Sequence, residues 1–258
     1  PVNRISSCDE LPKPFIGLLK RLHEKFTPWQ ERLVVRRTHA LDLSHKGHPP
    51  AFSRTDLPEP NWRREPPPWC VDQRNQMTGP ADDDKLVVQM LNSGSPGVMI
   101  DLEDSQANYW GNLHRGIQNT SAALHGDLIY EHPDRGTVGI KPGNTVIFVR
   151  PRGLHMSQWG VFDEPVAAPL FDLALLTYKL NFGKLRHPLC IYIPKSESAE
   201  EALWWRELFR ALARENDLPP DYIQCMALVE SHPLAYQMEE FIWNLREHIL
   251  GLNLGRWD

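Results

Sequence analysis

The chain has 258 residues, of which 41% are hydrophobic and 24% charged, and its net charge at pH 7 is −5. This length is enough for one large domain or two smaller ones. The acidic balance argues against a nucleic-acid-binding surface, and the apolar runs stay short of the roughly 18 residues that a membrane span needs. We therefore expect a globular protein that binds neither nucleic acid nor membrane.

The cysteines indicate a reducing compartment. There are four, Cys8, Cys70, Cys190 and Cys225, and none belongs to a C-x-x-C pair. Cys190 and Cys225 lie inside apolar runs, where a buried and reduced thiol is the expected state. The first ten residues, PVNRISSCDE, lack the apolar core of a signal peptide. Together these features predict a cytoplasmic location.

Residues 1–86 differ in pattern from the rest of the chain. Phe15 to Phe26 has helical spacing, and Thr27-Pro28 predicts the end of that helix. Residues 45–69 are dense in prolines, charges and turn formers, which favours extended structure lying against another part of the molecule. We predict a helical segment followed by a long wrap, not an independent core.

Residues 87–258 alternate between strand-like and helical patterns. The strand-like runs are nearly continuous in apolar residues, which is typical of parallel strands covered on both faces. Strand–helix alternation predicts a parallel α/β sheet. The five runs are 97-GVMIDLED-104, 145-TVIFVRP-151, 189-LCIYIP-194, 223-IQCMALVE-230 and 249-ILGLNLG-255.

Helices are predicted between the last three runs. Residues 198–201, SAEE, form a capping-box sequence that opens a helix with an apolar stripe of Trp205, Leu208, Phe209 and Leu212. A second stripe at helical spacing leads from residue 234 into the run that begins at residue 249. Residues 125–139 form an excursion in the longer connection between the first two runs.

Ionisable residues follow every strand-like run. In a (β/α)₈ barrel the carboxyl ends of several strands form the active site, whereas an open doubly wound sheet binds ligands mainly at one crevice. Ionisable groups at all five ends therefore favour the barrel. They are Asp101, Glu103 and Asp104, then Arg150 and Arg152, then Lys195 and Glu197, then Glu230, and finally Asp258.

Several of these residues also have a purely structural interpretation. Asp104 with Ser105 can cap a following helix, and Lys195 with Glu197 can be a solvated surface pair. Glu230 ends a very apolar strand, where an unpaired carboxylate would be costly, and the Arg150 guanidinium after V-I-F-V needs an anion.

A magnesium site is the metal chemistry that these residues favour. Mg²⁺ usually takes one or two protein carboxylates and completes its shell with water and substrate oxygens. Glu230 and Asp258 are the best pair for this, since no histidine or cysteine spacing typical of zinc is present. Gly255 allows close approach of the backbone, whose amides can hold a carboxylate.

The same stretches resemble malate synthase in its shorter, A-type form. The resemblance covers nearly the whole chain and is weakest before residue 70. The matching stretches are 77-MTGP-80, 100-IDLEDSQANYWGNLHRGIQN-119, 148-FVRPRGLH-155, 169-PLFDLALLTYKL-180, 193-IPKSES-198, 227-ALVES-231 and 245-LREHILGLNLGRWD-258.

The resemblance implies a fold and an activity. The fold would be a TIM (β/α)₈ barrel, with about five of its eight strands in residues 87–258, preceded by an N-terminal helical clasp and wrap in residues 1–86. The activity would be Mg²⁺-dependent condensation of glyoxylate with acetyl-CoA, with thioester hydrolysis to malate and CoA in the glyoxylate cycle.

The resemblance also assigns roles to particular residues. Arg150 would be the catalytic arginine, and Glu230 and Asp258 the metal ligands. Substrate binding would fall to residues 255–258, with the amides around Trp257 and Asp258 holding the glyoxylate carboxylate. The metal's water shell would be lined by Asp101, Glu103 and Asp104, and the full set for substrate binding is Gly255, Arg256, Trp257 and Asp258.

One departure from the family pattern matters. The family's catalytic base is an aspartate far beyond the GRWD block, with which this sequence ends. We therefore expect a remaining C-terminal portion of the enzyme as a partner of this chain. Two alternatives stay open: a Mg²⁺-dependent acyl-CoA lyase of the citrate lyase β or malyl-CoA lyase type, and a non-catalytic malate-synthase-like protein.

Overall fold

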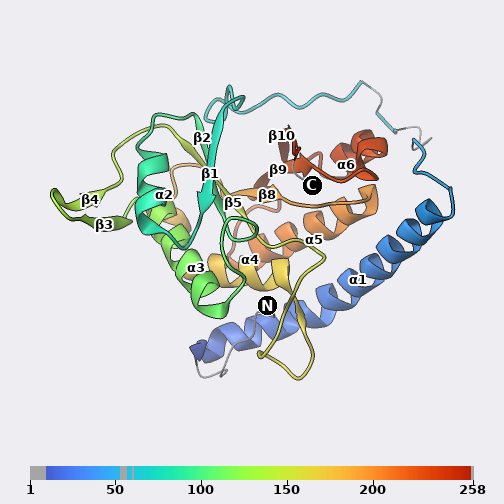
Figure 1. The fold of residues 1–258 in the computed structure, drawn as a ribbon, viewed down its shortest axis with the longest axis horizontal. Coiled ribbons are helices and arrows are strands. Elements are labelled where there is room, and N and C mark those ends of the chain that lie inside the picture. The colour runs from blue at the N-terminus through green and yellow to red at the C-terminus, as the bar shows by residue number, and fades with distance from the viewer. Residues whose placement is uncertain (1–9, 53–56, 60, 257–258) are drawn as a thin grey trace.

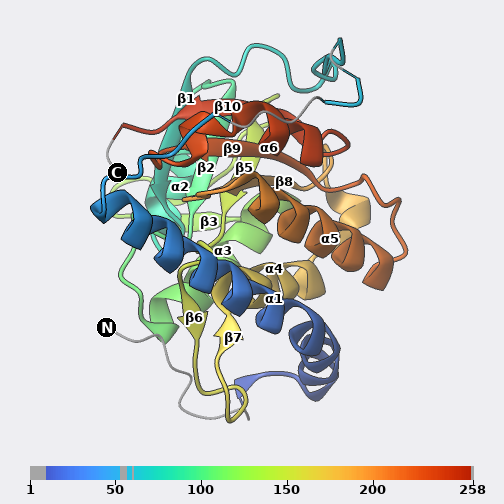
Figure 2. The same ribbon diagram turned by 90° about the vertical axis from the view of Figure 1, so that its right-hand side faces the viewer.

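A curled parallel sheet forms the centre of the molecule. The computed structural model describes residues 10–52, 57–59 and 61–256. Six parallel strands pair in the order β1-β2-β5-β8-β9-β10, and helices cover one face of the sheet (Figure 1, Figure 2). The strands are β1 (Gln76–Pro80), β2 (Gly97–Asp101), β5 (Val146–Arg150), β8 (Cys190–Ile193), β9 (Gln224–Val229) and β10 (Ile249–Leu254).

The strand order is that of a barrel. Within this sheet, each strand pairs with the sheet's next strand in chain order, so the order never reverses as it does at the switch point of a doubly wound sheet. This confirms the predicted partial TIM barrel. The sheet has one strand more than the sequence indicated. The sequence pattern did not reveal β1, because this strand contains a glycine and a proline and only one apolar residue before them.

Alternate residues of each strand face opposite sides of the sheet and build two separate cores. On β5, Ile147 and Val149 pack in the large cluster beneath the helices, whereas Val146 and Phe148 belong to a smaller cluster on the inner, concave face. The same alternation holds along the neighbouring strands. The inner cluster consists of Cys70, Met99, Val146, Phe148, Cys190, Tyr192, Met226 and Leu228.

The helices between the strands lie on the outer face. Buried aromatic and aliphatic side chains of α4 and α5 fill the space between helices and sheet; Trp204 and Trp205 are fully buried. The predicted stripe of Trp205, Leu208, Phe209 and Leu212 is buried as expected. The helices are α2 (Asp84–Leu91), α3 (Trp110–His125), α4 (Ala168–Lys179), α5 (Ala199–Glu215) and α6 (Met238–Asn244), with 3₁₀ turns η2 (Phe182–Lys184) and η3 (Leu234–Tyr236).

The first helix is longer than predicted. α1 spans Lys13–His45 and includes Pro28, so the expected end of the helix at Thr27-Pro28 was wrong. A proline inside a helix removes one backbone hydrogen bond and costs about 3 kcal/mol. Tertiary contacts offset this cost here. Phe26 and Leu33 are buried on either side of Pro28, and the Thr27 hydroxyl accepts a hydrogen bond from the Ala167 backbone N–H.

The predicted capping box does not form. Ser198 stands at the N-cap of α5 without a side-chain hydrogen bond to the helix. The Glu201 carboxylate instead accepts hydrogen bonds from the Glu197 backbone N–H and from Arg37 of α1. A guanidinium from another helix competes successfully with the local cap because it brings charge and two donors.

The stripe that begins at residue 234 is divided into several short elements. It forms η3 and the seven-residue α6 before β10 begins, where the sequence indicated one continuous helix. The residues of this stripe still pack inwards where they meet α5: Leu234, Phe241 and Leu245 are fully buried. The spacing therefore identified the buried face but overestimated the length of the helix.

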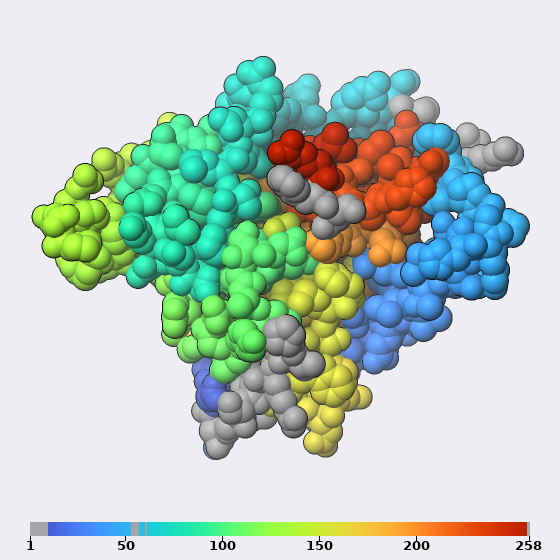
Figure 3. All heavy atoms as spheres, viewed as in Figure 1, coloured from blue at the N-terminus to red at the C-terminus, as the bar shows by residue number. Residues whose placement is uncertain are grey.

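The remaining segments lie around the sheet. Residues 125–139 contain the hairpin of β3 (Ile129–His132) and β4 (Gly136–Gly139), which projects from one side of the molecule (Figure 3). A smaller hairpin joins β6 (Ser157–Gln158) to β7 (Val166–Ala167). Cys70, Cys190 and Cys225 are buried free thiols, as predicted for the latter two. Within the described ranges, no helix has the length and apolar character needed to cross a membrane.

Candidate active site

Side chains at the carboxyl ends of three strands point to the inner face of the sheet. Asp101 follows Met99 by two residues, Arg150 follows Phe148, and Glu230 follows Leu228; the three earlier residues all belong to the inner cluster. Side chains two apart on a strand share a face, so the polar residues continue the same rows. Asp101 and Arg150 are also direct register partners on β2 and β5.

Arg150 is held by Asp101 through a bidentate ion pair. Its Nε and Nη2 donate to the two Asp101 carboxylate oxygens at 2.7 and 2.6 Å. Asp101 is fully buried, and burial would raise its pKa. The hydrogen bonds and charge of Arg150 outweigh that effect, so the pKa of Asp101 is lowered. Asp101 also accepts hydrogen bonds from the backbone N–H groups of Glu103 and Ser105. These bonds fix the Asp101 carboxylate, which in turn orients the Arg150 guanidinium.

Glu103 is a buried carboxyl with spare hydrogen-bonding capacity. Its side chain is 2% exposed, and its Oε1 accepts a 3.3 Å hydrogen bond from the Gly153 backbone N–H. Its Oε2 is buried and has no hydrogen-bond partner among the described residues. Burial raises the pKa of Glu103 to about 8, although the nearby positive charges of Lys195 and Arg150 oppose the shift. A buried acceptor of this kind is suited to a bound water, substrate group or ion.

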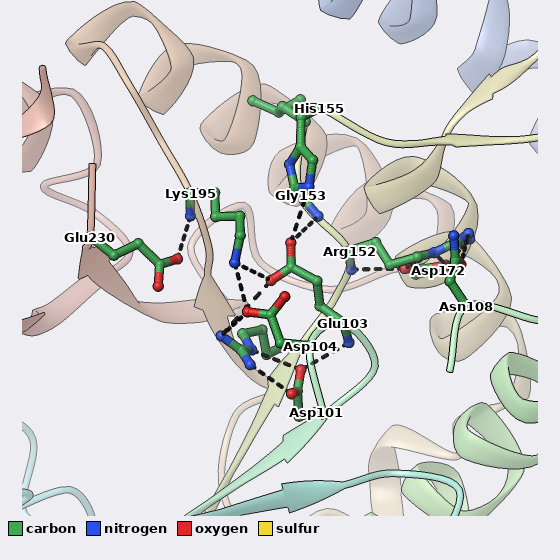
Figure 4. A network of polar contacts seen from close by, with 12 residues as sticks. Asp101, Glu103, Asp104, Asn108, Arg152, Gly153, His155, Asp172, Lys195 and Glu230 are labelled. Carbon is green, nitrogen blue, oxygen red and sulfur yellow. Dashed lines mark hydrogen bonds and ion pairs between the residues drawn. The ribbon is translucent and has the colours of Figure 1, made fainter. Parts of the chain in front are cut away.

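Asp104 and Lys195 complete a network across the strand ends (Figure 4). Lys195 Nζ lies 2.6 Å from Asp104 Oδ2 and 3.5 Å from Glu103 Oε2. Arg150 Nη1 lies 3.4 Å from Asp104 Oδ2 and 3.8 Å from Glu103 Oε2. Two cations therefore stand against the same two carboxyl groups. The Asp104 side chain is half exposed, so the network opens to solvent at this residue.

Glu230 joins this network through the backbone of Lys195. Its Oε1 accepts a 2.7 Å hydrogen bond from the Lys195 N–H. Gly255 packs directly against it: a Cβ at position 255 would stand 2.7 Å from Glu230 Cβ and 3.1 Å from Glu230 Oε2. A side chain at position 255 would therefore collide with Glu230, and the Gly255 N–H donates to the Val229 carbonyl at 3.0 Å. The role of Gly255 in substrate binding stays a prediction.

The structure describes all but two of the predicted site residues. It brings Asp101, Glu103, Asp104 and Arg150 into contact and connects Glu230 to them through Lys195. Arg256 is described and exposed. Trp257 and Asp258 lie outside the described residues, so the pairing of Glu230 with Asp258 stays a prediction.

The structure adds two residues to the predicted site. The sequence left Lys195 open between a strand-end role and a solvated surface pair with Glu197, and its ammonium lies in the carboxylate network. The structure also sets the Lys195 backbone apart: its φ is 47°, a value that few non-glycine residues adopt. His155, in the RPRGLH stretch, stands 3.7 Å from Glu103 Oε1 through its Nε2. Its place within that stretch, five residues after Arg150, was the available clue.

The donor set fits a hard cation. Among residues 10–52, 57–59 and 61–256, no group of three His, Cys, Asp or Glu side chains could hold a metal ion by itself. Magnesium does not require such a group, because it binds one or two carboxylates and keeps several waters. Glu230 is a carboxylate that such a site could use. Glu103 Oε2 accepts no hydrogen bond among the described residues, although Lys195 Nζ lies 3.5 Å away, so it could accept one from a metal-bound water.

The fold and site define a TIM-barrel type of protein with a charged site at the carboxyl ends of its strands. Residues 146–258 match the family model described as the malate synthase TIM barrel domain. The chain is 33% identical to malate synthase A of Escherichia coli over 94% of its own length and 47% of that protein. It is 34% identical to the glyoxysomal malate synthase of Gossypium hirsutum, over 96% of its length and 46% of that protein.

A third relative is the malate synthase of Myxococcus xanthus, at 32% identity over 94% of this chain and 46% of that protein. These matches identify the chain as a homologue of the malate synthases. It spans about half the length of the curated relatives that it matches.

Proposed function

We propose that this chain forms part of a Mg²⁺-dependent malate synthase, which condenses glyoxylate with acetyl-CoA and hydrolyses the thioester to malate and CoA in the glyoxylate cycle. The observation that carries the proposal is the Arg150–Asp101 pair facing Glu103 and Asp104 at the strand ends. The similarity to malate synthases over nearly the whole chain supports it.

Arg150 is proposed to stabilise the enolate oxygen as negative charge develops on acetyl-CoA. Its orientation is preset, because Asp101 takes Nε and Nη2 and leaves Nη1 directed towards the network. Burial works to lower the pKa of Arg150, but the hydrogen bonds and charge of Asp101 raise it instead, so the guanidinium stays charged at any working pH.

The proposed ligands of magnesium are Glu230 and Asp258. Glu103 and Asp104 are proposed to line the metal's water shell. A bound Mg²⁺ would supply Lewis-acid polarisation of the glyoxylate aldehyde. The protein's own contribution is to hold Glu230 in place with the Lys195 N–H and to keep a glycine beside it. The amides around Trp257 and Asp258 are proposed to hold the glyoxylate carboxylate.

By the resemblance, the base that removes a proton from the acetyl methyl group belongs to the half of the malate synthases that this chain does not match. Glu103 does not replace it in this proposal. Its role is to hold a water or substrate group beside Arg150. The rest of the enzyme is therefore the proposed partner of residues 1–258, with acetyl-CoA and glyoxylate as substrates.

The decisive experiment is a thiol-release assay with acetyl-CoA, glyoxylate and Mg²⁺ on the complete polypeptide. We expect CoA release that needs both substrates and falls to background in Glu230→Gln. Arg21→Lys, at an exposed pair with Glu215, is the control and keeps the parent rate. Reversible cleavage of malyl-CoA without net synthesis would favour the acyl-CoA lyase alternative, and absence of both reactions would favour a non-catalytic protein.

We also propose a cytoplasmic location. The three described cysteines are free thiols, which fits a reducing compartment. Fractionation of cells that produce the complete protein, with detection by antibody, tests this directly; recovery in an organelle fraction would contradict it.

A further inference from the structure

Lys195 stands at an unusual place in the backbone. It follows Pro194 directly after β8, and its φ of 47° lies in the left-handed region that glycine prefers. An L-residue persists there only where its surroundings hold it, and such residues cluster at functional sites. The contacts of Lys195 show what holds it.

Two contacts fix the Lys195 backbone from opposite sides. Its N–H donates to Glu230 Oε1 at 2.7 Å, and its carbonyl accepts from Arg37 Nη2 at 2.9 Å. Arg37 is itself fixed by a bidentate pair with the fully buried Glu201 of α5. The left-handed turn therefore links α1 and α5 to the carboxylate at the end of β9.

The side chain of Lys195 points to the other group of carboxylates (Figure 4). Its ammonium contacts Asp104 and Glu103, and the side chain is only 22% exposed. The second cation at these carboxylates, Arg150, has two of its nitrogens already bound by Asp101. Lys195 thus supplies positive charge to Glu103 and Asp104 while its amide orients Glu230.

We propose that Lys195 is a positioning residue and built-in counter-charge of this site: its amide orients Glu230, while its ammonium orients Glu103 and Asp104 and weakens the binding of a divalent cation there. The inference rests on the proposed function, because it concerns the same cation site. The inference assigns a role to Lys195, for which the sequence favoured a surface position and a site position equally. It also states that the Lys195 charge lowers the affinity of the site for metal.

The expected effect follows from Coulomb's law. A unit positive charge about 6 Å from a divalent cation repels it, and even with the screening of bulk water its removal should tighten Mg²⁺ binding about tenfold. The carboxylates of Glu103 and Asp104 would lose their anchor at the same time. Turnover should therefore fall even though the metal binds more tightly, a combination that simple loss of packing does not produce.

The test is Lys195→Met in the complete polypeptide, with Mg²⁺ affinity measured by calorimetry and turnover by CoA release. We expect about tenfold tighter Mg²⁺ binding and at least about tenfold lower kcat. Lys195→Arg keeps the charge and should retain the parent's Mg²⁺ affinity and most of its turnover. Lys184→Met, which removes a lysine paired with Asp127, controls for net charge and should change neither quantity.

Lys195→Gly separates the backbone from the side chain. It loses the same charge but adopts positive φ without strain, so it should match Lys195→Met in Mg²⁺ affinity and exceed it in Tm. Equal or weaker Mg²⁺ binding in Lys195→Met, or turnover at the parent rate, overturns the inference. If Glu230→Gln also leaves Mg²⁺ binding unchanged, the proposed metal site fails as well; if it abolishes binding, only the role of Lys195 fails.

Discussion

Two arginines at the end of β5 form similar ion pairs in very different surroundings. Arg150 and Arg152 are two residues apart, and each donates two nitrogens to one buried aspartate, Asp101 and Asp172 respectively. Arg150 points to the inner face and meets further carboxylates. Arg152 turns to the helix layer, where Asp172 belongs to α4.

The two guanidinium groups differ in how many of their N–H donors already have hydrogen-bond partners. Arg152 is 1% exposed, and its Nη1 and Nη2 also donate to Asn108 and Gln158. Arg150 keeps Nη1 for the network of Glu103 and Asp104. A saturated ion pair fixes a loop, whereas an arginine with donors still directed to a site can act on a substrate. Variants of the two regions should therefore affect different properties.

The largest effect is expected for Arg152→Met. It leaves the Asp172 carboxylate buried and uncompensated, which should lower the free energy of unfolding by about 3–5 kcal/mol. Urea unfolding measures this. Arg210→Met, at partly exposed ion pairs with Glu207 and Glu247, should stay within about 1 kcal/mol of the parent. A loss below about 1 kcal/mol in Arg152→Met would remove the contrast between the two arginines.

The next effect concerns Glu103 and pH. Its pKa of about 8 in the folded protein exceeds the roughly 4.3 of an unfolded chain, so between these values the folded state binds more protons. Stability should fall as pH rises through this window and stay level above it. The side chain of the Glu103→Gln variant cannot ionise. Its free energy of unfolding, relative to that of the parent, should therefore rise by on the order of 3 kcal/mol from pH 5 to pH 8.

This second comparison is made without metal, by urea unfolding at several pH values. Glu131→Gln changes an exposed carboxylate on the β3 strand of the hairpin and serves as the control for loss of one charge. Parallel pH curves for the parent and Glu103→Gln would mean that Glu103 is ionised in the folded protein at neutral pH.

Arg150→Lys should lower kcat by ~10²-fold, equivalent to about 2.7 kcal/mol, because lysine keeps the charge but loses the planar fork. The CoA-release assay on the complete polypeptide measures it. We expect Tm to change little, in contrast to Arg152→Met. Kinetics within a factor of a few of the parent would show that Arg150 only supports the fold.

The smallest effect is expected for Gly255→Ala. Its Cβ would stand 2.7 Å from Glu230 Cβ, so the strand or the carboxylate must shift, at about 1–2 kcal/mol. The shift should also weaken Mg²⁺ binding, which calorimetry can measure. Gly17→Ala on α1 meets nothing within 4 Å and should be neutral or slightly stabilising. Unchanged Mg²⁺ affinity in Gly255→Ala would separate Gly255 from the metal site.

The sequence by itself determined the architecture and much of the site. Near-continuous apolar runs require a sheet covered on both faces, and polar residues two positions beyond an inward row must share that row's face. Arg150 and Glu230 could therefore be placed on one edge without coordinates. The matching stretches added the family, because they occur in order along the chain.

Only the tertiary structure decided which neighbours each charged group has. Helix α1 passes through Pro28 because packing on both sides offsets a local cost, and Glu201 binds Arg37 in place of capping its own helix. Lys195 and Glu103 face each other across strands that lie about 90 residues apart in the chain. Ion pairs between distant segments, and the desolvation that shifts their pKa values, depend on distances that no local pattern encodes.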